Sequence, residues 1–304
     1  MRISSLYNSN AMISRLGVNG TRVNKLMEQL STLKRVNVPS DDPVAASRLV
    51  QLNREQSAIK QYQSNISSLS GSLAVQESQV TALNNQLDSL NSKLLSANNS
   101  THSQQDMSGY GAEISSMIDS MVEILNAKNE SGGYLFSGTK ADTRPVTLDK
   151  NGNYVFNGND KTRETDVASG VSISGTTQVA GSFSTSGNDL EVLNKLKALS
   201  EKMQDPNANF ADYQDEISEA IGRVKKSSDS VASLYTDLGG RQNRLELLKN
   251  VHDDISMANE QVVRDLSDTD WATASTNYQM YINSIQITNK AYSMVSQLNL
   301  FSLL

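Results

Sequence analysis

Apolar residues recur at helical spacing over most of the chain, and the longest run keeps a seven-residue repeat. This run predicts one coiled-coil helix from about residue 43 to 98, roughly 80 Å long at 1.5 Å per residue. Its a positions are Leu52, Ile59, Ile66, Leu73, Val80, Leu87 and Leu94. Its d positions are Tyr62, Leu69, Gln76, Leu83, Leu90 and Ala97.

A second seven-residue repeat begins at Phe210 and continues to Leu266. Its phase passes through Gly239-Gly240, where we expect a weakened or bent turn and not the end of the helix. The polar a residues His252 and Asn259 are interpreted as setting the register. The apolar a residues assigned to the rod core are Val224, Val231, Leu238 and Leu245, and the d positions include Tyr213, Ala220, Leu234, Leu248, Ile255 and Val262.

Two shorter helices are predicted between the long ones. The first covers about residues 106–131 and ends at Gly132-Gly133, a glycine pair suited to a helix C-terminus. The second starts at "NDLE", where Asn188 can cap the helix and Glu191 can complete a capping box.

Both ends of the chain are predicted to be amphipathic helices of about 30–40 residues with narrow apolar stripes. Isolated helices of this kind are marginal in water, so we expect them to be largely disordered in the free monomer and to fold on meeting neighbours. We interpret the stripes as subunit-assembly surfaces. They comprise Leu16, Val23, Leu26, Leu30, Leu33, Trp271, Tyr278, Tyr281, Ile285, Tyr292 and Val295.

Residues 136–185 differ in character, being rich in Thr, Ser, Val and Gly with Asn-Gly turn dipeptides. They predict a small β domain that folds independently of the helices. "DKNGNYVFNGND" could also be interpreted as a calcium loop with ligands Asp149, Asn151, Asn153 and Asp160. Because its glycine is misplaced and it does not end in glutamate, a hairpin is favoured.

The predicted fold is therefore mainly α: a long antiparallel helical bundle or coiled-coil rod formed by the two halves of the chain, with a small inserted β domain. We expect residues 1–40 and 270–304 to form an inner assembly domain. Residues 41–135 and 186–269 would form the rod, and residues 136–185 the β domain.

The stretch "VPSDDPVAAS" holds two of the chain's four prolines and an acidic pair. The pair could be a catalytic pair of carboxylates, but no general acid or base partner can be named nearby. A helix joint is favoured. The first helix would end before Pro39, Asp42 would cap the next helix, and Pro43 would occupy its first turn, with Asp41 in the turn between them.

Composition excludes several classes of function. The 304 residues include no cysteine and only two histidines, His102 and His252, which disfavours zinc sites and Ser-His or cysteine catalysis. A formal charge of -6 disfavours nucleic-acid binding. No apolar run is long enough for membrane insertion, and the N-terminal segment lacks the apolar core of a cleaved signal peptide. No cofactor is indicated.

Several segments resemble the flagellar hook-associated protein 3 family of the flagellin superfamily. "LSTLKRVNVPSDDPVAASRLV" is similar to its N-terminal signature, with Leu33 standing where glycine is usual. "GGYLFSGTKADTRPV" resembles the entry into its β domain, and "LGGRQNRLE" a segment shared with flagellins. The end, "TDWATASTNYQMYINSIQITNKAYSMVSQLNLFSLL", resembles the family's C-terminal helix.

The resemblance implies a structural, non-enzymatic protein that joins the flagellar hook to the filament. It implies contacts with hook-associated protein 1, with flagellin and with further copies of itself in a ring. It also implies type III export with a cytoplasmic chaperone and an extracellular location on the flagellum. The alternatives are flagellin itself and, less favoured, a type III secreted coiled-coil protein, which would need a membrane segment; an enzyme is the weakest option.

Overall fold

The computed structural model describes residues 2–99, 103–184 and 188–301. These residues fall into two compact units, Met1–Ile59 with Asp253–Leu304, and Lys60–His252. The elements in order are α1 Arg2–Thr32, α2 Pro43–Ala97, α3 Gln104–Leu125, β1 Val146–Leu148, β2 Tyr154–Phe156, β3 Glu164–Ala168, β4 Val171–Ser174, the short 3-10 helix η1 Ala180–Ser182, α4 Glu191–Gln204, the 3-10 helix η2 Phe210–Asp212, α5 Gln214–Ser267 and α6 Trp271–Phe301.

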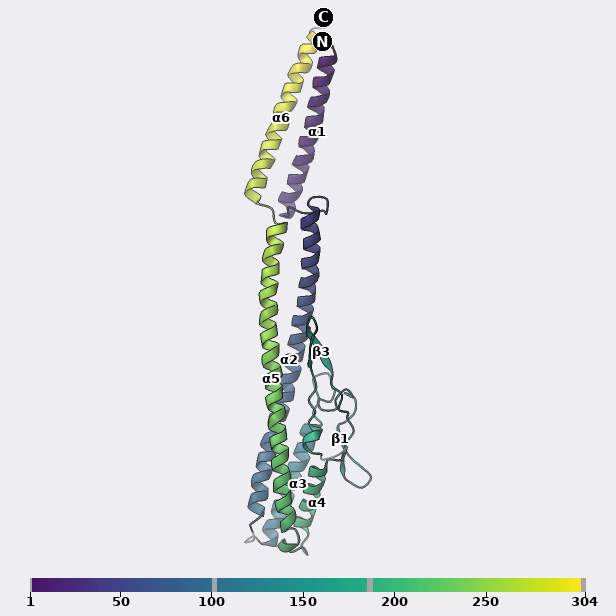
Figure 1. Ribbon diagram of the computed structural model, residues 1–304, viewed down its shortest axis with the longest axis vertical. Coiled ribbons are helices and arrows are strands. Elements are labelled where there is room, and N and C mark those ends of the chain that lie inside the picture. The colour runs from purple at the N-terminus through teal and green to yellow at the C-terminus, as the bar shows by residue number, and fades with distance from the viewer. Residues whose placement is uncertain (1, 100–102, 185–187, 302–304) are drawn as a thin grey trace. The chain divides into compact units, whose positions relative to one another are not determined.

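The long helices α2 and α5 lie side by side and antiparallel, and each contributes residues to both units (Figure 1). Hydrogen bonds join Gln56 to Ser256, and Glu77 to Gln242, so the numbering rises along one helix as it falls along the other. The predicted a residues of α2 are all at most 5% exposed, and so are Val224, Val231, Leu238 and Leu245 of α5. The predicted antiparallel helical fold is confirmed.

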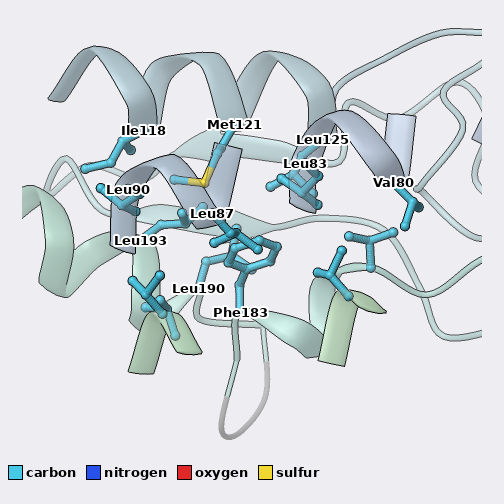
Figure 2. Packing of buried hydrophobic residues seen from close by; sticks show 14 of the residues in the cluster. Val80, Leu83, Leu87, Leu90, Ile118, Met121, Leu125, Phe183, Leu190 and Leu193 are labelled. Atoms are coloured by element: carbon cyan, nitrogen blue, oxygen red, sulfur yellow. The ribbon is translucent and has the colours of Figure 1, made fainter. Parts of the chain in front are cut away.

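The two shorter helices close the core at one end of the second unit. Met121 of α3 lies near Leu87 of α2 and Phe183, which precedes α4, and Ile118 and Leu125 lie beside Leu90 and Leu83 in the same cluster (Figure 2). A Cβ atom on Gly111 of α3 would lie 2.8 Å from the backbone oxygen of Ser200 in α4. This close approach requires glycine, because any larger residue would push the two helices apart.

The β region contains two separate antiparallel hairpins, β1–β2 and β3–β4. In the first hairpin, the Asp149 carboxylate accepts hydrogen bonds at 2.8 Å from the backbone N–H groups of Asn151 and Asn153. Gly152 has a φ of +80°, which a side chain would strain. The segment is thus a hairpin, in agreement with the favoured interpretation, and Asp149 stabilises its turn.

The expectation that the β region folds independently is wrong. Val167, Val179 and Phe183 are fully buried in the same apolar cluster as the helical residues. The side chain of Gln76 in α2 also donates to the Gly175 carbonyl at 2.9 Å and accepts from the Thr177 hydroxyl at 2.8 Å. Two-stranded hairpins cannot bury their own apolar face, so these strands use the helices as their core.

Two predicted boundaries around α3 and α4 also need correction. α3 ends at Leu125 with Asn126 as its C-cap, well before Gly132-Gly133. α4 begins only at Glu191, preceded by Leu190 without a side-chain cap. Asn188 does not cap it; its carbonyl accepts the Phe156 N–H at 2.8 Å and so holds the chain against β2.

The second heptad run is interrupted at its start and continuous afterwards. Phe210 lies in η2, and α5 begins at Gln214, later than the repeat predicts. α5 then runs without a break through Gly239-Gly240. Its a positions are buried as far as Asn259, but the d residues Ile255 and Val262 are exposed. The heptad interpretation therefore fails for the last d positions.

Candidate assembly surface

The terminal helices α1 and α6 pack along each other in antiparallel directions (Figure 1). The Asn19 amide donates to the Ser284 hydroxyl at 3.2 Å, and Arg22 donates to the Tyr281 hydroxyl at 3.1 Å. The Arg22 guanidinium also lies 5.3 Å from the centre of the Tyr281 ring, a cation–π contact. These polar pairs set the register of the two helices. Tyr281 belongs to a predicted stripe, but the sequence did not indicate its partner Arg22 or the pair of Asn19 with Ser284.

Few side chains of this terminal pair are buried. Among the described side chains of α1 and α6, only Val23 and Ala274 are less than 9% exposed. Trp271 and Tyr292 are exposed, and Leu33 lies beyond the end of α1, also exposed. The side chain of Val295 is outside the described residues. The remaining predicted stripe residues are half-buried between the helices: Leu16, Leu26, Leu30, Tyr278, Tyr281 and Ile285.

The terminal pair also presents apolar side chains that the predicted stripes did not include. They are large, exposed and spread over both helices, and a shallow open groove of about 820 Å³ runs along α6 between Ser275 and Thr288. On α6 these residues repeat every seven positions, a second phase that the sequence shows, whereas those on α1 share no single phase. The exposed residues are Tyr7, Ile13, Val18, Met27, Met280, Ile287 and Met294.

At the joint between α1 and α2, the acidic pair stabilises the turn. The Asp41 carboxylate forms an ion pair with Lys25 at 2.9 Å and accepts the backbone N–H groups of Asn37 and Val38. The ammonium of Lys25, followed by these two amides, lowers the pKa of Asp41 to about 2. The carboxylate is therefore ionised at neutral pH and committed to the turn.

Asp42 and Pro43 occupy the positions that the sequence assigns to them. Asp42 caps α2 by accepting the Ala45 N–H at 3.0 Å and pairs with Arg35 at 3.0 Å. The Ala45 amide, then Arg35, lowers the pKa of Asp42. Pro43 is the first residue of α2, and Pro39 lies in the preceding turn, beyond the end of α1. The two carboxylates are thus held by separate partners and do not form a catalytic pair.

The connection between α5 and α6 is hydrogen-bonded to the connection between α1 and α2. The Thr269 N–H donates to the Leu33 carbonyl at 3.0 Å, and the Arg35 N–H donates to the Ser267 carbonyl at 2.6 Å. Asp270 then caps α6 through the N–H groups of Ala272 and Thr273. Leu33 has a φ of 59°, the left-handed region that glycine adopts without strain.

The polar a residues of α5 are buried but differ in their partners. His252 lies 2.7 Å from the Val167 carbonyl through Nε2 and stacks on Tyr62 with ring centres 5.5 Å apart. Asn259 is 9% exposed, and its amide nitrogen has no hydrogen-bond partner among the described residues. His102 is outside the described residues. His252 thus joins the β3–β4 hairpin to the long helices.

Neither a metal-binding cluster nor a membrane-spanning helix occurs among the described residues. No group of three acidic or histidine side chains there could hold a metal ion. None of the described helices combines the length and apolar character that a membrane crossing requires. The apolar surface of α1 and α6, beside an ionised joint, is suited to association with other helices.

Comparison with known proteins first defines the class. Residues 3–141 match the family model described as the bacterial flagellin N-terminal helical region. Flagellar hook-associated protein 3 of Escherichia coli strain K12 is 26% identical over 92% of each chain. The protein of the same name from Salmonella typhimurium is 25% identical, again over 92% of each chain.

A solved structure then gives the particular family. The structure of a flagellar hook-associated protein from Vibrio parahaemolyticus is 34% identical, with a TM-score of 0.68. It is similar over 75% of this chain and 100% of its own. The chain belongs to the flagellar hook-associated protein family and is a structural component of the bacterial flagellum. Because the curated relatives are hook-associated protein 3, this interpretation is favoured over flagellin.

Proposed function

We propose that this chain is the subunit that joins the flagellar hook to the flagellin filament, and that the terminal pair α1 and α6 is its assembly surface. The observation that supports this is the apolar surface left open on both helices. Exposed apolar patches of this kind on a soluble subunit mark sites of protein association. The family supplies the location, the flagellum.

The partners follow from that location. On one side the subunit contacts hook-associated protein 1, on the other flagellin, and laterally further copies of itself in a ring. Before assembly it passes through the flagellar type III export channel, held beforehand by a cytoplasmic chaperone. We assign it no catalytic role, in keeping with a family of structural flagellar proteins.

The narrow stripes also explain how assembly is controlled. Fixing the backbone of a residue costs roughly 1–2 kcal/mol, and burial of apolar surface returns only about 25 cal/mol per Å². One pair of helices with half-buried stripes cannot fully offset that cost. We therefore propose that the terminal pair is only marginally stable in the free subunit, where it forms but opens often, and that it becomes stably ordered when neighbouring subunits cover it. Amide exchange should be rapid in residues 2–32 and 271–301 of the free subunit and slow in the assembled one.

The test is deletion of the gene combined with location of the protein. The deletion strain should keep its hooks, lack filaments and release flagellin into the medium. Immunogold labelling of complemented cells should mark a short zone between hook and filament. A chain lacking residues 270–304 should remain folded, by circular dichroism, and fail to complement. Normal filaments in the deletion strain, or labelling along the whole filament, would contradict the junction role.

A further inference from the structure

The part of α2 and α5 within the first unit is a two-helix segment whose outer edges face away from each other. Leu52 and Asn259 are buried between the helices. A residue two positions away lies about 200° around the helix and so points outward. This places Val50 and Arg54, on either side of Leu52, on an outer edge of α2, and Met257 on an outer edge of α5. Asp254, two positions after buried His252, shares that α5 edge.

Each edge combines one exposed apolar side chain with one unpaired charge. We call Val50 and Arg54 the α2 edge, and Asp254 and Met257 the α5 edge. Val50 is 53% exposed and Met257 is 63% exposed. Arg54 and Asp254 are both exposed, and within the described ranges neither has a hydrogen-bond or ion-pair partner. The two edges therefore have opposite charges and matching apolar contacts.

The axial spacing of the two residues is also similar on the two edges. Along α2, Arg54 follows Val50 by four residues, a rise of about 6 Å. Along α5, Asp254 precedes Met257 by three residues, a rise of about 4.5 Å in the opposite sense of the chain. When an α2 runs antiparallel to an α5, as within the subunit, Val50 can contact Met257 while Arg54 reaches Asp254. One register satisfies both pairs to within one residue.

We propose that the α5 edge of one copy packs against the α2 edge of the next copy in the junction ring, with Arg54 paired to Asp254 across the contact. The proposal rests on the proposed function, since it supplies a lateral contact for the ring. The two edges are different surfaces of one chain, so the contact is head-to-tail and can be repeated from one copy to the next. Two residues per edge make a small contact, which sets register while the terminal helices supply most of the association.

The absence of native cysteine allows a direct test. The double variant Val50→Cys, Met257→Cys is expressed as the full chain in the deletion strain, and isolated flagella are treated with a short bis-maleimide. Helices pack with axes about 8–10 Å apart, so two outward-facing edges of one subunit are out of reach of the reagent. We expect a ladder of crosslinked multimers on a denaturing gel. Each single-cysteine variant should remain monomeric.

Charge variants in the double-cysteine background test the ion pair. Arg54→Asp alone and Asp254→Arg alone should each lower the multimer yield about fivefold, and the two together should restore it. The matched control is Val44→Cys with Met257→Cys, because Val44 is even more exposed at 81% but lies off the edge. This control should give no ladder.

Three outcomes would overturn the edge contact. They are dimers from a single-cysteine variant, which indicate a two-fold contact; a crosslink to flagellin in place of a second copy; and no ladder from motile cells with normal filaments. The last outcome would not contradict the junction role, since the variant protein still supports filament assembly. The junction role would be contradicted by a different result, the presence of filaments in the deletion strain.

Discussion

The terminal pair and the bundle of the second unit use the same helical spacing of apolar residues, yet bury them to very different extents. In the bundle, Leu73, Leu83, Leu87 and Leu90 of α2 are fully buried. In the terminal pair, Val23 is the only large apolar side chain of those described that is buried. The difference is the number of neighbours, since the buried residues of α2 share one apolar cluster with residues of α3, α4, α5 and the β region, whereas α1 packs mainly against α6.

This comparison shows that periodicity fixes which face of a helix is apolar, but not how completely that face is covered. Where the chain itself covers the whole apolar face, the face forms a stable core, and a substitution there lowers the free energy of unfolding. Where the face is only partly covered, other subunits can bury the rest, and a substitution there lowers the free energy of association. The same substitution should therefore affect folding in one region and assembly in the other.

The largest expected effect is on the bundle core. Leu87→Ala should lower the free energy of unfolding by about 2–5 kcal/mol, because it leaves a cavity in a fully buried layer. Leu95→Ala is the matched control, since Leu95 is on the same helix but 55% exposed, and it should change stability by less than about 0.5 kcal/mol. Denaturant unfolding measures both. Similar effects of the two would mean that the register of α2 is wrong.

An intermediate effect is expected at the joint beside the terminal pair. Leu33 holds a left-handed conformation that costs a non-glycine residue about 1–2 kcal/mol. Leu33→Gly should relieve that strain and, after the extra entropy of glycine in the unfolded chain, stabilise the first unit by up to about 1 kcal/mol.

The control for this substitution is Leu33→Ala, which also removes the exposed side chain but keeps the strained backbone. It should give no gain in thermal unfolding experiments. A gain equal to that of glycine would assign the effect to the side chain and not to the backbone.

A smaller effect on the stability of the joint is expected when the pH is lowered. The folded pKa of Asp41, about 2, lies below its ordinary value of 3.8, so its ionised form stabilises the joint. That stabilisation should be complete above about pH 4 and be lost as the pH falls from about 4 to 2. Carbonyl NMR of the Asp41 side chain should titrate near pH 2, with the Asn37 and Val38 amide signals moving in parallel. Titration near pH 4 would contradict the closed joint.

The smallest effect on the isolated subunit is expected on the open surface of the terminal pair. Ile287 is 69% exposed, so Ile287→Asp should change the free energy of unfolding by less than about 0.5 kcal/mol. In cells the same variant should fail to attach filaments, because it places a charge in an apolar contact. The neighbouring exposed site supplies the control, Gln286→Asp, which should leave both properties unchanged. Full motility of the Ile287 variant would exclude this face from assembly.

The long helices and the joint could be predicted from the sequence because their signals are local. Heptad spacing identified Leu52 to Leu94, and proline with aspartate identified the cap at Asp42. The limits of α3 and α4 were less accessible. Gly132-Gly133 was a plausible stop, but Asn126 ends α3 earlier, and its side chain is bonded to Val146 of β1. Contacts with residues distant in sequence thus decided those boundaries.

The coverage of each apolar face could not be predicted in the same way. Nothing local distinguishes Val167 or Phe183, buried against the helices, from residues of a self-contained β domain. Likewise Ile255 and Val262 continue the heptad of α5 but are exposed. The assembly role of the terminal stripes stays a prediction, because their coverage depends on other subunits.

The bonded connections of the joint have a mechanical consequence. Between the terminal pair and the long helices, the chain crosses twice, once at Leu33–Asp42 and once at Asp268–Asp270. The two crossings are tied by the bonds from Thr269 to Leu33 and from Arg35 to Ser267. A twisting load applied to α1 and α6 is therefore shared by two backbone connections that are hydrogen-bonded to each other. Each connection limits the rotation of the other. Torque can therefore be transmitted through this short irregular segment, about which a single connection would allow free rotation.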